Sequence, residues 1–167
     1  MNSELIKKYG FQQYMSALQK CHRAAIGVIL ADEIDRTSTT CSKFGGKPKL
    51  PSGLEWPLDG VRPLDYLLQI NLSQVTQSIR TGLLPESGTL TFFYNLDEQP
   101  WGYDPKKLGG FRVLYTAEGD YVEVDVPNEE FYLEEHQLGF TPISTLPHPG
   151  SRAMNRLADK IGMSEDE

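Results

Sequence analysis

The sequence predicts an α+β fold, in which a single domain carries a mostly antiparallel sheet with an N-terminal helix and a C-terminal helix. Apolar residues recur at helical spacing near the two ends of the 167-residue chain. Between these ends, short apolar or alternating segments are separated by turns that contain Gly and Pro. Helix, antiparallel strands and helix is the element order of an α+β domain. We expect this domain to cover residues 1–163 and a frayed acidic tail to cover residues 164–167.

The first two predicted elements are a helix and a buried strand. Asn2 or Ser3 can cap a helix that continues to about Cys21, although Gly10 lowers its helix propensity. Residues 24–31 (AAIGVILA) are continuously apolar and include β-branched side chains, which is typical of a strand buried on both faces. We therefore place this strand at the centre of the sheet.

Residues 43–57 (KFGGKPKLPSGLEWP) predict an ordered loop. Gly45 and Gly46 allow positive φ, and the prolines stiffen the backbone. Lys47 follows the two glycines as in a phosphate-binding loop, but the Gly-Lys-Ser/Thr that opens a helix is missing and Pro48 lacks an N–H. We interpret this loop as a structural clasp over the sheet and expect Trp56 to be mostly buried.

The middle of the chain predicts strands and turns. Residues 111–115 and 121–126 alternate between apolar and polar side chains, and a turn around Gly119 separates them, which predicts a hairpin. The other expected elements are a strand in the second half of residues 64–72, a short helix over 73–80, a strand over 89–95, a surface loop over 97–110, edge strands over 131–133 and 139–143, and a last helix from Ser151 to Gly162.

The net charge of −7 is unevenly distributed along the chain. Residues 116–147 contain no Lys or Arg but eight acids: Glu118, Asp120, Glu123, Asp125, Glu129, Glu130, Glu134 and Glu135. Such a segment repels phosphate backbones and attracts basic surfaces. Nucleic acid is therefore excluded as the expected partner and a cationic protein is favoured, while the alternative is a solvated face without a partner.

Two features indicate a cytoplasmic protein with no membrane partner. The longest apolar run, residues 24–31, is much shorter than the roughly 18 residues that a membrane-spanning helix requires. Cys21 and Cys41 are the two cysteines of the chain and do not form a close pair, so we expect a reducing compartment.

No recognisable catalytic motif is present, and we expect neither an enzyme nor a metal or cofactor. His22, His136 and His148 are far apart in the sequence, unlike the close pairs of metal sites. The acidic residues could include an acid/base pair, but most such carboxylates lie on protein surfaces. Trp56 and Trp101 are more typical of loop anchors packed on a core than of ligand platforms.

Several short motifs together resemble a known family. They are Ser42-Lys43-Phe44-Gly45-Gly46, Pro48, Leu50-Pro51, Trp56-Pro57, Leu68-Gln69-Ile70-Asn71-Leu72, Leu84-Pro85, Gly88, Leu90, Phe92-Phe93, Trp101-Gly102, Phe111-Arg112-Val113 and Tyr115. In this order and spacing, residues 24–126 resemble a YwqG-like domain, a bacterial family of uncharacterised function. The resemblance implies a compact α+β fold dominated by antiparallel strands, and it implies no established catalytic residue or cofactor. Longer members continue with a second Gly-containing, Gln-bearing segment, which is not found after Ser151.

Families of this kind also occur beside bacterial polymorphic toxins, where small acidic members act as immunity proteins. The resemblance therefore implies a non-catalytic module that binds a cognate basic toxin and occludes its active site. We expect six acids to contact the toxin: Glu123, Asp125, Glu129, Glu130, Glu134 and Glu135.

Two alternatives stay open. One is a small-molecule binding domain or unrecognised enzyme that uses the loops around Trp56 and Trp101, with Gln69 and Arg112 as polar contacts. The other is a structural or scaffolding module.

Overall fold

The computed structural model describes residues 3–8, 10–31, 41–78, 82–102, 104–148 and 150–162. The chain divides into two compact units, Met1–Gly27 with Pro142–Glu167, and Val28–Thr141. The predicted acidic tail lies outside the described residues, and the domain boundary at residue 163 stays a prediction.

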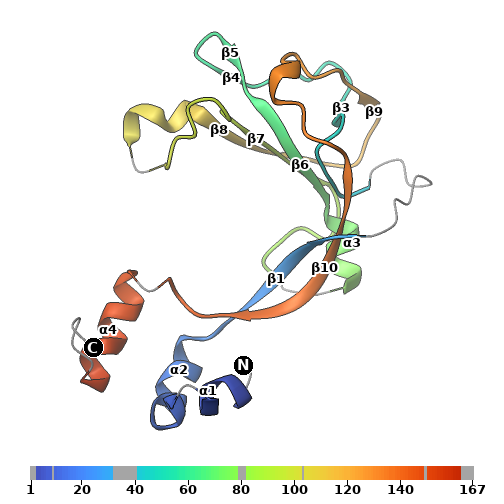
Figure 1. Ribbon diagram of the computed structural model, residues 1–167. Coiled ribbons are helices and arrows are strands. Elements are labelled where there is room, and N and C mark those ends of the chain that lie inside the picture. Colours follow the sequence, from blue (N-terminus) through green and yellow to red (C-terminus); the bar gives the residue numbers. More distant parts are fainter. Residues whose placement is uncertain are drawn as a thin grey trace. The chain divides into compact units, whose positions relative to one another are not determined.

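Most of the fold is a six-stranded sheet in the order β1-β10-β2-β6-β7-β8 (Figure 1). The pairs β10–β2, β2–β6, β6–β7 and β7–β8 are antiparallel. In this order, the strands are β1 (Arg23–Leu30), β10 (His136–Thr145), β2 (Lys43–Phe44), β6 (Asp65–Asn71), β7 (Thr89–Tyr94) and β8 (Phe111–Thr116). The predicted α+β class, with a mostly antiparallel sheet and helices near both ends, is confirmed.

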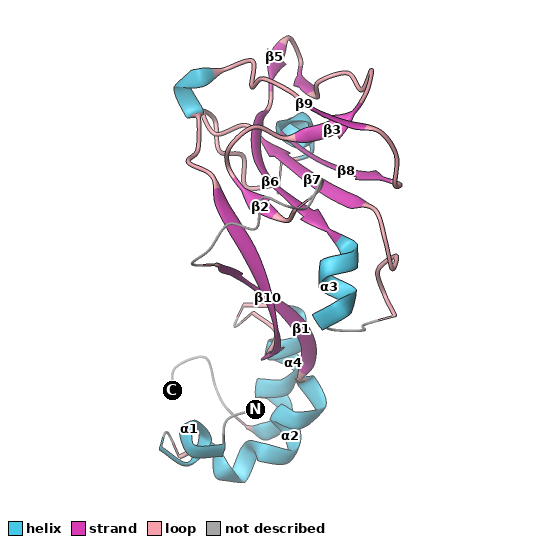
Figure 2. Cartoon of the chain, turned by 90° about the vertical axis from the view of Figure 1, so that its right-hand side faces the viewer, coloured by secondary structure: helices cyan, strands magenta, loops and turns pink. Residues whose placement is uncertain are grey.

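Two small sheets and several short helices complete the larger unit. β3 (Lys49–Pro51) pairs with β9 (Tyr121–Glu123), and Figure 2 shows these strands beside each other. β4 (Leu58–Asp59) pairs with β5 (Arg62–Pro63). The helices are α3 (Leu72–Ser78) and the 3₁₀ turns η2 (Pro105–Gly110) and η3 (Glu129–Phe131).

The core of this unit is built on the inner face of β6 and β7. Leu50, Leu64, Tyr66 and Phe93 form one buried cluster. Burial alternates along β7, as expected for a strand whose successive side chains point to opposite faces, and this alternation places Phe93 on the buried face. Trp56 packs edge-on against Phe93 with ring centroids 5.2 Å apart. Its indole N–H also donates to the Leu64 carbonyl at 2.8 Å. The indole is half-buried, so the expected packing of Trp56 on the core is present although its burial is incomplete.

The smaller unit consists mainly of helices α1 (Ser3–Lys8), η1 (Phe11–Tyr14), α2 (Met15–Cys21) and α4 (Arg152–Ile161). α2 contacts α4, and the His22 Nε2 atom is hydrogen-bonded to the Ser144 hydroxyl. Ser151 caps α4 by accepting from the Met154 N–H, as predicted, and Gly162 ends the helix in the left-handed region. The predicted N-terminal helix is present, but it is not continuous to Cys21, since Gly10 at φ +74° separates α1 from η1.

Three further predictions are wrong for reasons of tertiary pairing. Residues 24–31 were expected at the sheet centre, but β1 lies at its edge, and Val28, Ile29 and Leu30 are 47%, 52% and 60% exposed. An apolar run does not reveal which strands become its neighbours. The expected β8–β9 hairpin does not form, because β8 pairs with β7 and β9 pairs with β3. Of residues 131–133, expected as an edge strand, Phe131 ends the η3 turn and the next two residues have no strand pairing.

The packing of Trp56 predicts a measurable loss of stability. Trp56→Ala removes the edge contact with Phe93 and the hydrogen bond to Leu64, so we expect a loss of about 3 kcal/mol in the free energy of unfolding. Trp101→Ala is the matched control, because the Trp101 side chain is 86% exposed and should change stability by less than about 0.5 kcal/mol. Urea unfolding followed by circular dichroism measures both, and equal losses would contradict this description of the core.

Candidate functional site

The acidic segment, defined here as residues 118–135, lies along the clasp formed by residues 43–57. β9 pairs with β3, which places Glu123 opposite Lys49. Two backbone hydrogen bonds extend this contact, from the Val124 N–H to the Pro48 carbonyl at 3.0 Å and from the Ser52 N–H to the Asp120 carbonyl at 3.2 Å. The clasp is therefore partly strand, rather than the loop that the sequence predicted, and it gives the acidic segment a fixed backbone.

Gly45 and Gly46 allow the closest approach between these two segments. Both residues have positive φ, +65° and +70°. A Cβ on Gly45 would lie 2.2 Å from the Glu134 carbonyl oxygen, and one on Gly46 would lie 2.3 Å from the Glu135 Oε2 atom. The Gly46 N–H donates to the Leu133 carbonyl at 2.9 Å. These contacts give the glycine pair a structural role, as expected of the clasp, because a Cβ on Gly45 would collide with backbone and one on Gly46 would displace the Glu135 side chain.

Lysines of the clasp face acids of the acidic segment. The Lys43 ammonium lies 2.8 Å from the Glu135 carboxylate, and the Lys43 side chain is only 5% exposed. The Lys47 ammonium lies 2.6 Å from the Asp125 carboxylate on the surface. The hydrogen bond and the charge of Asp125 raise the pKa of Lys47 above its usual value. Residues 116–147 contain no Lys or Arg in the sequence, but in the folded chain two lysines of the clasp lie beside acids of this segment.

A second anchor lies in the middle of the acidic segment. The Asn128 side-chain amide donates to the buried Asp65 carboxylate at 3.4 Å, and Arg62 lies 3.4 Å from the same carboxylate. The Arg62 guanidinium also lies over the Phe131 ring, 5.5 Å from its centroid. Asn128 caps η3 by accepting from the Glu130 N–H. These contacts fix the short turn from which Glu129 and Glu130 project into solvent.

The structure separates the six predicted contact residues into two kinds. Glu135 is part of the Lys43 ion pair and is half-buried. The other five are exposed: Glu123, Asp125, Glu129, Glu130 and Glu134. Asp125 and Glu129 line one recess of about 450 Å³ together with Lys47, Val126 and Tyr132. Tyr132, 51% exposed, is a site residue that sequence reasoning missed, because nothing local distinguishes it from a core tyrosine.

The residues of the small-molecule alternative do not come together around a cavity. Gln69 is fully buried, and its side chain accepts from the Lys49 N–H and donates to the Cys41 carbonyl. Trp56 lines a cavity of only about 10 Å³, the size of one water molecule. Trp101 is exposed, so its expected role as an anchor packed on the core is wrong. Arg112 is exposed on β8.

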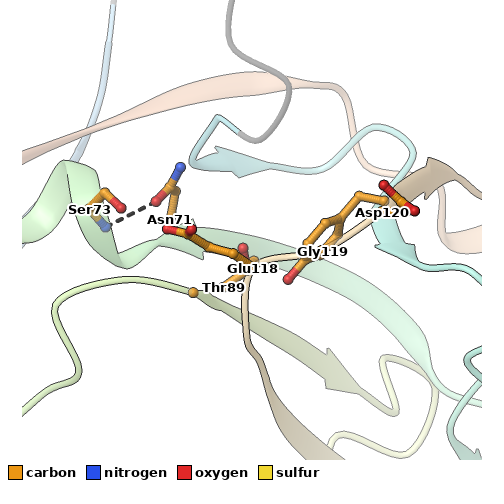
Figure 3. Close-up of a pocket in the computed structure, with 8 residues that line it drawn as sticks. Asn71, Ser73, Thr89, Glu118, Gly119 and Asp120 are labelled. Atoms are coloured by element: carbon orange, nitrogen blue, oxygen red, sulfur yellow. Dashed lines mark hydrogen bonds between the residues drawn. The ribbon is translucent and has the colours of Figure 1, made fainter.

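A larger cavity of about 470 Å³ lies elsewhere in the same unit (Figure 3). Its walls come from Asn71 at the end of β6, Ser73 in α3, Thr89 in β7 and residues 118–121 at the turn before and at the start of β9. The sequence did not predict this cavity, since its walls come from residues 71–73, 88–89 and 118–121, which are distant from one another in the chain.

Two further properties concern metals and membranes. Within the described residues, no group of three or more His, Cys, Asp or Glu side chains could hold a metal ion. The helices in the described part of the chain are all too short or too polar to span a bilayer.

A family comparison covers both the clasp and the acidic segment with one domain. The model of a domain of unknown function, DUF1963, matches residues 42–167. The chain belongs to this family. The DUF1963 match begins at the residue before β2 and contains both the clasp and the acidic segment, whereas β1 lies outside it. A search among curated proteins found no match.

The buried ion pair between clasp and acidic segment predicts that Glu135→Gln lowers stability more than Asp125→Asn does. Glu135→Gln leaves the buried Lys43 ammonium without its counter-charge, so we expect a loss of about 2 kcal/mol in the free energy of unfolding. Asp125→Asn breaks the exposed pair with Lys47 and should leave stability near that of the parent protein. Chemical denaturation of both variants at neutral pH measures the difference. A Glu135→Gln variant as stable as Asp125→Asn would show that the buried pair contributes nothing.

Proposed function

We propose that this DUF1963 protein is a non-catalytic immunity protein that binds a basic toxin through the exposed acids of the acidic segment and occludes the toxin's active site. The resemblance to YwqG-like domains suggests this class of function. The observation that carries the proposal is the fixed backbone of the acidic segment, which presents five exposed carboxylates, two of them (Asp125 and Glu129) in the recess with Tyr132. A surface that is already ordered loses little conformational entropy on binding.

The exposed acids and Tyr132 have complementary roles in this proposal. Glu123, Asp125, Glu129, Glu130 and Glu134 attract a basic surface over several ångströms and accelerate association. Tyr132 lines the recess beside Asp125 and Glu129, where a partly exposed aromatic ring is suited to act as a binding anchor. Glu135 acts indirectly, since its ion pair with Lys43 keeps the backbone of residues 133–135 against Gly45 and Gly46.

The proposal predicts that reversing four exposed acids slows association with the toxin. The test uses Glu123→Lys, Asp125→Lys, Glu129→Lys and Glu130→Lys in one chain. The proposal predicts a toxin domain encoded immediately upstream, and the product of that gene is the binding partner in the test. We expect the association rate at low salt to fall at least about tenfold and protection of cells from the toxin to be lost, because steering depends on opposite charge.

The matched control reverses four exposed acids outside the acidic segment, Glu55, Glu86, Asp97 and Asp159, to Lys. It changes the net charge by the same amount and should retain most of the association rate and the protection. Full protection by the first variant, equal slowing in both variants, or failure of the chain to co-purify with the upstream product would each contradict the proposal.

A further inference from the structure

The cavity of about 470 Å³ beside the β8–β9 turn has the size of a small-molecule site. It lies apart from the recess at Lys47, Asp125 and Tyr132, and the two share no lining residue among those that the structure describes. Neither the family match nor the proposed toxin contact gives it a role. Its existence does not depend on the proposed function.

The walls of this cavity are fixed by hydrogen bonds between distant parts of the chain. Asn71 pairs with Thr89 across β6 and β7, and Thr89 pairs with Thr116 across β7 and β8. The Leu72 N–H donates to the Gly88 carbonyl at 2.9 Å. A ligand would therefore meet a preformed site and would not have to order these strands.

The turn that carries Glu118 and Asp120 is also fixed at both of its ends. The Tyr121 hydroxyl lies 2.7 Å from the Thr116 hydroxyl and donates to the Ala117 carbonyl at 2.7 Å. The Ser52 N–H donates to the Asp120 carbonyl at 3.2 Å. These bonds tie the turn to β8 on one side and to the clasp on the other, so the backbone that carries the two acids has a defined position beside the cavity.

Gly88 supplies a wall of bare backbone. Its φ is +95°, and a Cβ there would lie 2.7 Å from both the Thr116 carbonyl oxygen and the Tyr115 ring. No side chain fits at this position without displacing the neighbouring strand, so a glycine is required where the chain before β7 approaches β8.

The chemistry of the lining decides which ligand fits. Glu118 and Asp120 supply two carboxylates, and Asn71, Ser73, Thr89 and Tyr121 supply amide and hydroxyl groups. In Figure 3 the Glu118 side chain extends toward the side of the cavity where Asn71 and Ser73 lie. None of the described lining residues carries a positive charge or an aliphatic side chain larger than that of Thr. Anions and apolar ligands are therefore disfavoured.

We propose that this cavity binds a small organic polycation, a molecule with two or more amino groups of the polyamine class. One ammonium group would face Glu118 and a second would face Asp120, and the remaining N–H groups would donate to the amide and hydroxyl oxygens of the walls. The volume accommodates several carbon atoms between the two ammonium groups.

The test is isothermal calorimetry of the full chain with spermidine at 150 mM salt, where non-specific attraction is screened. Saturable binding to one site is expected, and citrate should not bind. Nuclear magnetic resonance locates the site, since the amide signals of Gly88 and Gly119 should shift while those of Gly10 and Gly53 should not.

Glu118→Gln with Asp120→Asn should weaken spermidine binding at least about fivefold, because both charge contacts are removed. Glu55→Gln with Asp97→Asn changes the net charge equally at exposed positions and should bind as the parent does. The proposal is overturned by the absence of saturable binding, by equal affinities in the two variants, or by shifts that do not include Gly88 and Gly119. None of these outcomes bears on toxin neutralisation.

Discussion

The close approach of the backbone at Gly45 and Gly46 to residues 133–135 is the constraint on which the candidate surface depends. Neither glycine tolerates a Cβ, since each would collide with Glu134 or Glu135. The same contact brings Lys43 to Glu135, 92 residues along the chain, as a mostly buried ion pair. Removing the approach would separate the clasp from the acidic segment and leave the buried Lys43 ammonium unpaired.

This constraint explains how the acidic segment keeps an ordered backbone although its negative charges repel one another. Three kinds of contact oppose that repulsion: the β3–β9 pairing, the lysines of the clasp, and the link from Asn128 to Asp65. With Glu135 engaged in a mostly buried ion pair, the other five proposed contact acids are exposed, and one of them, Asp125, pairs with Lys47 at the surface. The arrangement favours binding to a cationic partner, because the carboxylates are ordered before the partner arrives.

Local patterns in the sequence predicted the α+β class, the β6 and β7 strands, the capped helix α4 and the structural role of the glycine pair. These features depend on periodicity, capping and φ, which act over a few residues. The edge position of β1 and the β3–β9 pairing depend on which distant strands become neighbours. The lysine partners of Glu135 and Asp125, the recess at Tyr132 and the cavity beside Glu118 arise from the same long-range pairing, so no local pattern revealed them.

Hydrogen exchange in a Gly46→Ala variant tests most directly whether the clasp orders the acidic segment. The Val124 and Ser52 amides donate across this contact, and the Leu90 amide in β7 serves as the reference for the intact sheet. We expect exchange at Val124 and Ser52 to accelerate at least about tenfold while Leu90 stays protected, because only the contact is opened. Unchanged protection of Val124 and Ser52 in this variant would show that the acidic segment is ordered without the clasp.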